Sequence, residues 1–114
     1  MSGDRSAGLG RVRLVEIALR ALSPGINDAF TAITGKWHLG NGSPEHLPTR
    51  RGFDHQHGLY LGMHDYFTHE REGGLDWHRH DRALRQEGYA TDLIGDEAAD
   101  LIERHGGTKP FFLY

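Results

Sequence analysis

The sequence predicts an α/β chain, and three segments carry that prediction. Residues 30–37 are rich in β-branched and aromatic side chains, which favour a short strand. Residues 91–105 repeat apolar side chains at helical spacing and run into Gly106 and Gly107, as an amphipathic helix does at its end. Residues 111–114, Phe-Phe-Leu-Tyr, are wholly apolar, as expected of a buried strand in a parallel sheet.

The first 33 residues are expected to form a part of their own, with residues 34–114 as the second part. Residues 1–10 carry glycine, serine and charge and predict a frayed tail. Apolar residues recur at helical spacing from 12 to 22, and Pro24 and Gly25 then end the predicted helix. The arginines beside this stripe also fit a membrane-surface helix, but packing against the rest of the chain is the favoured interpretation.

Residues 41–88 show little periodicity and are rich in glycine, histidine, aspartate and arginine. They are expected to form a long loop region. So long a stretch without regular elements is uncommon in a compact domain, which indicates that it packs against something else.

Composition excludes several classes of protein. The chain has 114 residues, 37% hydrophobic residues and a mean hydropathy of −0.61, which predicts a thin core. Its formal charge of −3 argues against a general nucleic-acid binder. No run approaches the roughly 18 apolar residues of a membrane span, and residues 1–13 lack the apolar core of a signal peptide. A cytoplasmic location is the default expectation, with the compartment left open.

Nine histidines are the main compositional excess, and there is no cysteine. Disulfides and thiolate zinc sites are therefore excluded. Histidine and carboxylate side chains of the loop region could form a zinc site, but no helix or hairpin fixes their spacing, so solvated loop residues are favoured. The residues concerned are His55, His57, His78, His80, His64, His69, Asp54, Asp65 and Asp76.

Two further charged groups are interpreted as solvated surface. One is the acidic side of the predicted helix. The other is the pair Arg50 and Arg51, which could bind an anion. The acidic set is Asp92, Asp96, Glu97, Asp100 and Glu103.

Five motifs in order resemble the interior of arylsulfatase-type enzymes, in the sulfatase family of the alkaline-phosphatase-like superfamily. The resemblance implies that residues 34–114 are an incomplete fragment of a sulfatase α/β domain, preceded by an extra N-terminal helix. The motifs are Gly35-Lys36-Trp37-His38-Leu39-Gly40, Arg51-Gly52-Phe53-Asp54, Asp65-Tyr66-Phe67, Gly88-Tyr89-Ala90-Thr91-Asp92 and Lys109-Pro110-Phe111-Phe112-Leu113-Tyr114.

The resemblance implies a chemistry as well. Sulfatases attack a sulfate ester with a formylglycine hydrate made from Cys or Ser in a Cys/Ser-x-Pro-x-Arg motif, while a calcium ion polarises the sulfate. The lysine and histidine of the first motif lie beside the sulfate, which makes Lys36 and His38 the candidate catalytic residues. If the backbone there is extended, both side chains point to one face. From the residues alone, the same stretch also fits a strand-to-loop turn with Trp37 in the core and Lys36 and His38 solvated.

The departures from the family decide what is expected of this chain. It has no cysteine, and none of its serines is followed by proline two residues later and arginine four later. The family's calcium ligands have no counterpart here either, so calcium binding by this fragment is not expected. Without nucleophile and metal, Lys36 and His38 are not expected to hydrolyse the family's sulfate ester substrates.

Residues 12–33 resemble an uncharacterised bacterial family of predicted membrane proteins through the stretch Arg20-Ala21-Leu22-Ser23-Pro24-Gly25-Ile26-Asn27-Asp28. The two resemblances meet near residues 30–33, which predicts a chimeric reading frame. The alternative function is therefore a non-enzymatic chimeric or pseudogene remnant, an association or binding piece that uses its His-rich loop and the exposed apolar strand at 111–114.

Overall fold

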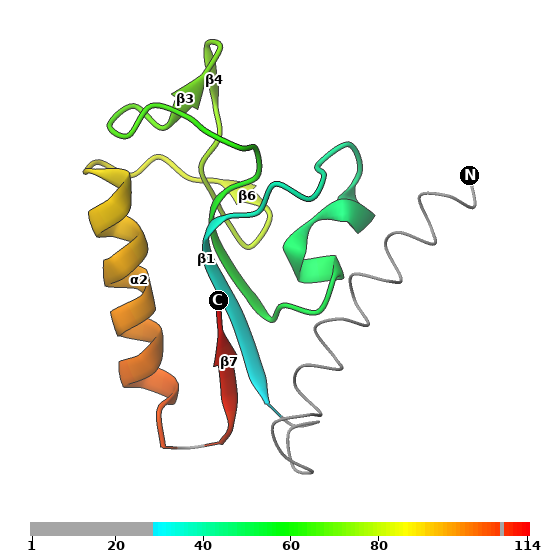
Figure 1. Cartoon of the computed structure of the whole chain (residues 1–114), viewed down its shortest axis with the longest axis vertical. Coiled ribbons are helices and arrows are strands. Elements are labelled where there is room, and N and C mark those ends of the chain that lie inside the picture. The colour runs from blue at the N-terminus through cyan, green and yellow to red at the C-terminus, as the bar shows by residue number, and fades with distance from the viewer. Residues whose placement is uncertain (1–28, 108) are drawn as a thin grey trace.

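The computed structural model describes residues 29–107 and 109–114 (Figure 1). The helix expected at 12–22 lies outside these residues. The described part is a mixed sheet of five strands with one long helix, α2 (Ala90–His105), packed against it. The α/β class is therefore confirmed. No helix in this part has both the length and the apolar character that crossing a bilayer requires.

The centre of the sheet is parallel. β1 (Phe30–Lys36) pairs with β2 (His55–Leu59) on one side and with β7 (Phe111–Leu113) on the other, both in parallel. The sequence predicted β1 to within a residue, α2 to within a residue, and the parallel character of β7. The expectation that 111–114 is fully buried is wrong, because β7 occupies an edge of the described sheet and its residues are only half-buried.

The other side of the sheet is antiparallel. β5 (His78–Arg79) pairs with β2, and β6 (Arg82–Ala83) pairs with β5. His80 and Asp81 join them with backbone φ angles of 51° and 70°. Two successive positive φ angles in a two-residue loop are the geometry of a type I′ turn, which suits the twist of a hairpin.

A smaller hairpin is formed by β3 (Glu70–Arg71) and β4 (Gly74–Leu75), and it lies at the top of the molecule in Figure 1. Two short 3-10 turns, η2 (Pro44–His46) and η3 (Pro48–Arg50), follow the segment after β1. The expectation of a structureless loop over 41–88 is therefore wrong. Its central error is β2, a strand whose five residues are all buried in the middle of the sheet.

Two apolar clusters form the core. One contains Ile33, Trp37, Phe53 and Tyr60, with Leu47 and Phe112 packed against it. The other contains Leu59, Trp77 and Ala90 and receives Leu93 and Ile94 from α2. Both clusters of the described residues are small, and buried polar side chains fill much of the interior around them.

Candidate functional site at the carboxyl end of β1

The segment after β1 is held by backbone hydrogen bonds and by one buried ring. The amides of Trp37 and His38 donate to the carbonyls of Leu59 and Tyr60 at 2.9 and 2.8 Å, which extends the β1–β2 pairing past the end of β1. The Trp37 side chain is buried, and its Nε1 donates to the carbonyls of Gly40 and His46 at 3.1 and 3.0 Å. Trp37 therefore anchors the segment and leaves its two neighbours outside the core.

Both predicted site residues, Lys36 and His38, are exposed at this end of the sheet. The extended-chain argument for their common face does not apply, because His38 has a left-handed backbone with φ at 54°. Such a conformation is uncommon for a residue other than glycine, and it turns the chain sharply after Trp37. The geometry agrees with a strand-to-loop turn, and it also presents an ammonium group and an imidazole to solvent.

The imidazole of His38 lies against the backbone of Gly62. A Cβ atom placed on Gly62 would lie 2.9 Å from His38 Cε1 and 3.0 Å from Nε2, which is closer than real Cβ contacts. Gly62 therefore leaves the space that the ring occupies.

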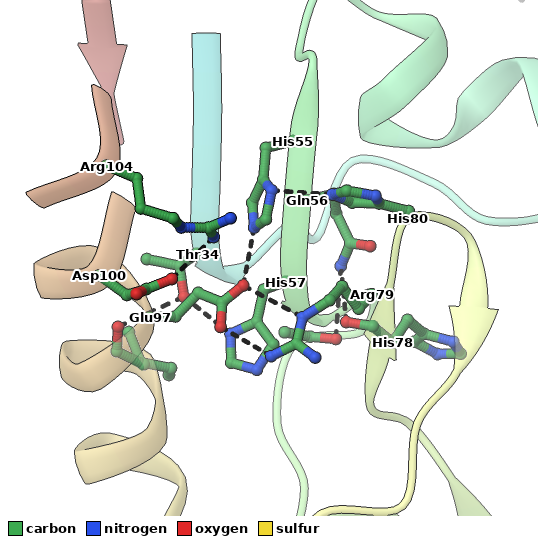
Figure 2. Close-up of polar contacts among 12 residues, drawn as sticks. Thr34, His55, Gln56, His57, His78, Arg79, His80, Glu97, Asp100 and Arg104 are labelled. Carbon is green, nitrogen blue, oxygen red and sulfur yellow. Dashed lines mark hydrogen bonds and ion pairs between the residues drawn. The ribbon is translucent and has the colours of Figure 1, made fainter. Parts of the chain in front are cut away.

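Polar side chains lie in a layer between the sheet and α2, among them Thr34, His57 and Glu97, which are labelled in Figure 2. His57 Nδ1 lies 3.0 Å from the Thr34 hydroxyl, and its Nε2 lies 3.1 Å from the amide oxygen of Gln86. Trp77 Nε1 donates to the same oxygen at 2.8 Å. Because that oxygen only accepts, Nε2 of His57 carries the proton and Nδ1 accepts from Thr34. Burial lowers the pKa of His57, which keeps the ring neutral.

Glu97 is the charged centre of this layer. Arg79 donates to both its oxygens, from Nε at 3.1 Å and Nη2 at 2.7 Å, and His55 Nε2 lies 2.7 Å from Oε2 (Figure 2). His80 Nε2 in turn lies 2.8 Å from His55 Nδ1. Burial opposes ionisation of Glu97, but the hydrogen bonds from Arg79 and His55 outweigh it and lower its pKa. Burial lowers the pKa of His55.

This arrangement corrects three expectations. Glu97 does not belong to a solvated acidic face, because it is buried under α2 and paired with Arg79. His55 and His57 are not solvated loop residues, because β2 carries both of them into the interior. Arg51 is not a surface residue either; it is buried, and its Nε donates to the carbonyl of Glu45 at 2.6 Å.

The zinc hypothesis finds no support in the geometry. The described part of the chain brings no three histidine or carboxylate side chains together as metal ligands. His55 and His57 instead use their nitrogens on Glu97, His80, Thr34 and Gln86. The same finding bears on calcium, since the described carboxylates do not form a set of ligands for it.

Asp76, which was expected to be a solvated loop residue, is buried and forms a second polar centre. Its two oxygens accept from the amides of Tyr60 and Leu61, both at 2.9 Å, and from His78 Nε2 at 3.0 Å. Burial opposes its ionisation, but these three hydrogen bonds outweigh that effect and lower the pKa of Asp76. The side chain therefore fixes the carboxyl end of β2 and orients His78. Its spacing in the sequence carries no signal of this role.

Two cavities flank the sheet. One of about 690 Å³ lies at the amino ends of β1 and β2 and is lined by members of the Glu97 cluster, with Asp100 and Arg104 at its side. The other, of about 480 Å³, lies at the carboxyl end of β2 beside Tyr60, Leu61 and Asp76. Only the second is at the end where Lys36 and His38 lie.

The parallel strands β1, β2 and β7 with α2 packed against them define a segment of an α/β domain. Comparison with known proteins makes the class specific, because about three quarters of the chain is homologous to part of known sulfatases. The predicted resemblance is therefore confirmed.

The relatives include arylsulfatase J of Mus musculus, 37% identical over 92 residues, which cover 74% of this chain and 15% of that protein. N-acetylglucosamine-6-O-sulfatase of Bacteroides thetaiotaomicron is 33% identical over 84 residues, covering 71% of this chain and 12% of that protein. The crystal structure of Ps i-CgsB in complex with k-i-k-neocarrahexaose matches 77% of this chain and 23% of its own, with a TM-score of 0.67 and 30% identity. The chain thus spans a minor part of each relative.

A second family overlaps the beginning of the chain. Residues 4–52 match a family described as "Predicted membrane protein (DUF2254)". The match includes β1 and the turn that carries Lys36 and His38 as well as residues outside the described part. The predicted division of the chain at residues 33 and 34 remains a prediction.

Proposed function

We propose that this chain is a sulfatase-like segment that binds the sulfate group of a sulfate ester through Lys36 and His38. One observation carries the proposal: the buried Trp37 fixes a turn at the carboxyl end of a parallel strand and presents these two side chains to solvent. Ligands of α/β proteins usually bind at that end of the sheet. Homology to sulfatases supports the assignment of the ligand.

The chemistry follows from charge. Transfer of a sulfuryl group builds negative charge on its oxygens, and a fixed ammonium group and an imidazole N–H stabilise that charge. Lys36 supplies the positive charge. The His38 imidazole supplies a hydrogen bond, and its packing against Gly62 limits the orientations that it adopts.

We further propose that these 114 residues alone do not hydrolyse the ester. The sequence contains no cysteine and no serine in a Ser-x-Pro-x-Arg motif, from which a sulfatase-like nucleophile is made. The residues of the described part also do not fit a calcium site. A nucleophile would therefore have to come from another polypeptide segment, and Lys36 and His38 would act on a sulfate that this segment also contacts.

The test combines binding with turnover. Calorimetry of the purified chain with phenyl sulfate is expected to show binding that Lys36→Ala and His38→Ala each weaken about tenfold, the value of one charge-assisted hydrogen bond. Arg85→Ala, at an exposed position away from this turn, is the matched control. No phenol is expected to be released. Turnover that His38→Ala abolishes would contradict the expected inactivity, and equal effects of all three variants would contradict the site.

A second candidate function is self-association through β7. This strand lies at an edge of the described sheet, and Tyr114 beside it is exposed. An apolar edge offers unpaired backbone groups to a second strand. Sedimentation velocity at rising concentration is expected to show dimers that Tyr114→Lys dissociates, since charge at an edge opposes pairing. A monomer at all concentrations would rule this function out.

A further inference from the structure

The cavity of about 480 Å³ at the carboxyl end of β2 has a wall of mixed character. Leu47, Leu61 and Leu75 make it partly apolar, and Arg71 and His78 add polar groups. It lies between the segment before η2 and the β3–β4 hairpin. This is a concave surface with few convergent polar groups, which is the usual form of a small-molecule site.

The only carboxylate in this wall is already satisfied. Asp76 is buried and accepts hydrogen bonds from two backbone amides and from His78 Nε2. The Asp76 carboxylate is therefore satisfied by hydrogen bonds within the protein. Because the Asp76 carboxylate accepts, Nε2 of His78 carries a proton, and Nδ1 of the neutral ring is an acceptor to which a ligand hydroxyl can donate.

The position of the His78 ring is also fixed from its face. Tyr60 stacks on it with ring centroids 3.8 Å apart and the planes 7° from parallel. A ring held by Asp76 at one edge and by Tyr60 on one face is oriented before any ligand arrives, which lowers the entropy cost of binding.

Arg71 is the positive charge of this cavity. Its side chain makes no ion pair with any residue of the described ranges. Glu70 precedes it on β3, where successive side chains point to opposite faces. Among the described residues, the wall thus combines a guanidinium that makes no ion pair, which suits an anionic group, with an oriented imidazole acceptor, which suits a hydroxyl.

One short segment links this cavity to the sulfate site. Tyr60 and Leu61 line the cavity, and the next residue, Gly62, lies against the His38 ring. We propose that the cavity is a subsite for a second anionic group of the ligand, held by Arg71, with the acceptor nitrogen Nδ1 of His78 beside it for a hydroxyl. The substrate class is then a sulfate ester that carries a further sulfate or carboxylate. This inference rests on the proposed function for the position of the first sulfate.

The test compares two probes that differ by one group, hydroquinone monosulfate and hydroquinone disulfate, by calorimetry on the full chain. The disulfate is expected to bind about tenfold more tightly, as one additional charge-assisted contact provides. Arg71→Ala should remove this preference and Arg71→Lys should keep part of it. Arg50→Ala, which removes an exposed arginine outside the cavity, is the matched control. His78→Gln adds a test of the imidazole, with the unfolding temperature measured for each variant.

The outcomes separate this inference from the proposed function. Equal affinity for both esters, or equal loss in the Arg71→Ala and Arg50→Ala variants, overturns the subsite while the sulfate site stands. A preference that depends on Arg71 and is insensitive to Lys36→Ala and His38→Ala supports the subsite and contradicts the proposed function. Absence of binding by either ester overturns both.

Discussion

At the scale of single residues, Glu97 carries the largest buried charge interaction described. Its carboxylate takes two hydrogen bonds from Arg79 and one from His55, and it is only 9% exposed. Removing one partner of such a group leaves the others with an uncompensated charge or an unsatisfied donor.

Glu97→Ala is therefore expected to lower the free energy of unfolding by about 3 kcal/mol. Asp100→Ala, on the same helix, removes an exposed pair with Arg104 and should cost less than about 0.5 kcal/mol. Urea unfolding of both variants measures the difference. Similar small losses in both would show that the Glu97 cluster does not stabilise the fold.

His57 predicts how stability depends on pH. Burial lowers its pKa below the ordinary value of 6.5, so the unfolded chain binds a proton near pH 6.5 that the folded chain still excludes. Stability should therefore fall as the pH drops below about 6.5, until the folded pKa is reached. His55 acts in the same direction.

Measurement of the free energy of unfolding between pH 7.5 and 5 checks this expectation. His57→Gln should flatten part of the decline, while His46→Gln, at a half-buried position outside the polar layer, should leave it unchanged. A decline that is the same in both variants would show that His57 does not cause it.

Sequence patterns identified some of these residues and missed others. Lys36 and His38 are candidates because a motif marks them, and their role stays a prediction. Glu97 was misjudged because its place on the helix carries no sign of Arg79, which lies 18 residues earlier on β5. The polar partner that justifies a buried charge is a property of the folded chain, so helical periodicity alone could not supply it.

At the scale of elements, β2 is the strand that the sequence did not reveal. Its residues His-Gln-His-Gly-Leu show no apolar alternation, yet all five are buried. The strand is stable at the centre of the sheet because Glu97, Gln86 and Thr34 satisfy its histidines. β1 was predictable from its β-branched and aromatic side chains, and α2 was predictable from apolar side chains at helical spacing.

β1 and β2 approach closely at a pair of glycines. Gly35 and Gly58 are partners in register, and a Cβ on Gly58 would lie within 3 Å of Gly35 backbone atoms, where neither strand has space for it. Gly58 also has a φ of 135°, which other residues rarely adopt.

Gly58→Ala should therefore destabilise the chain by about 2 kcal/mol or more, because the strands must separate. Gly95→Ala is the matched control within α2, where a Cβ meets nothing within 4 Å. It should stabilise by up to about 1 kcal/mol through helix propensity. Thermal unfolding compares the two, and a Gly58→Ala variant as stable as the parent would contradict the close approach.

At the scale of the whole molecule, the two ends of the sheet differ in chemistry. The amino end carries the Glu97 cluster, in which Arg79 is paired, and Arg104 beside it pairs with Asp100. The carboxyl end carries exposed Lys36 and His38 and the cavity with Arg71. Among the described residues, an incoming anion therefore meets positive charge without an ion-pair partner at the carboxyl end.

The most direct measurement is an NMR titration of the chain with sodium sulfate, read from the backbone amides and the histidine ring resonances. Sulfate binding at the proposed site should give saturable shifts at Lys36, Trp37, His38 and Gly62, which His38→Ala reduces. Shifts confined to residues around Arg79 and Arg104, or shifts at Lys36 and His38 that never saturate, would contradict a sulfate site at the carboxyl end of β1.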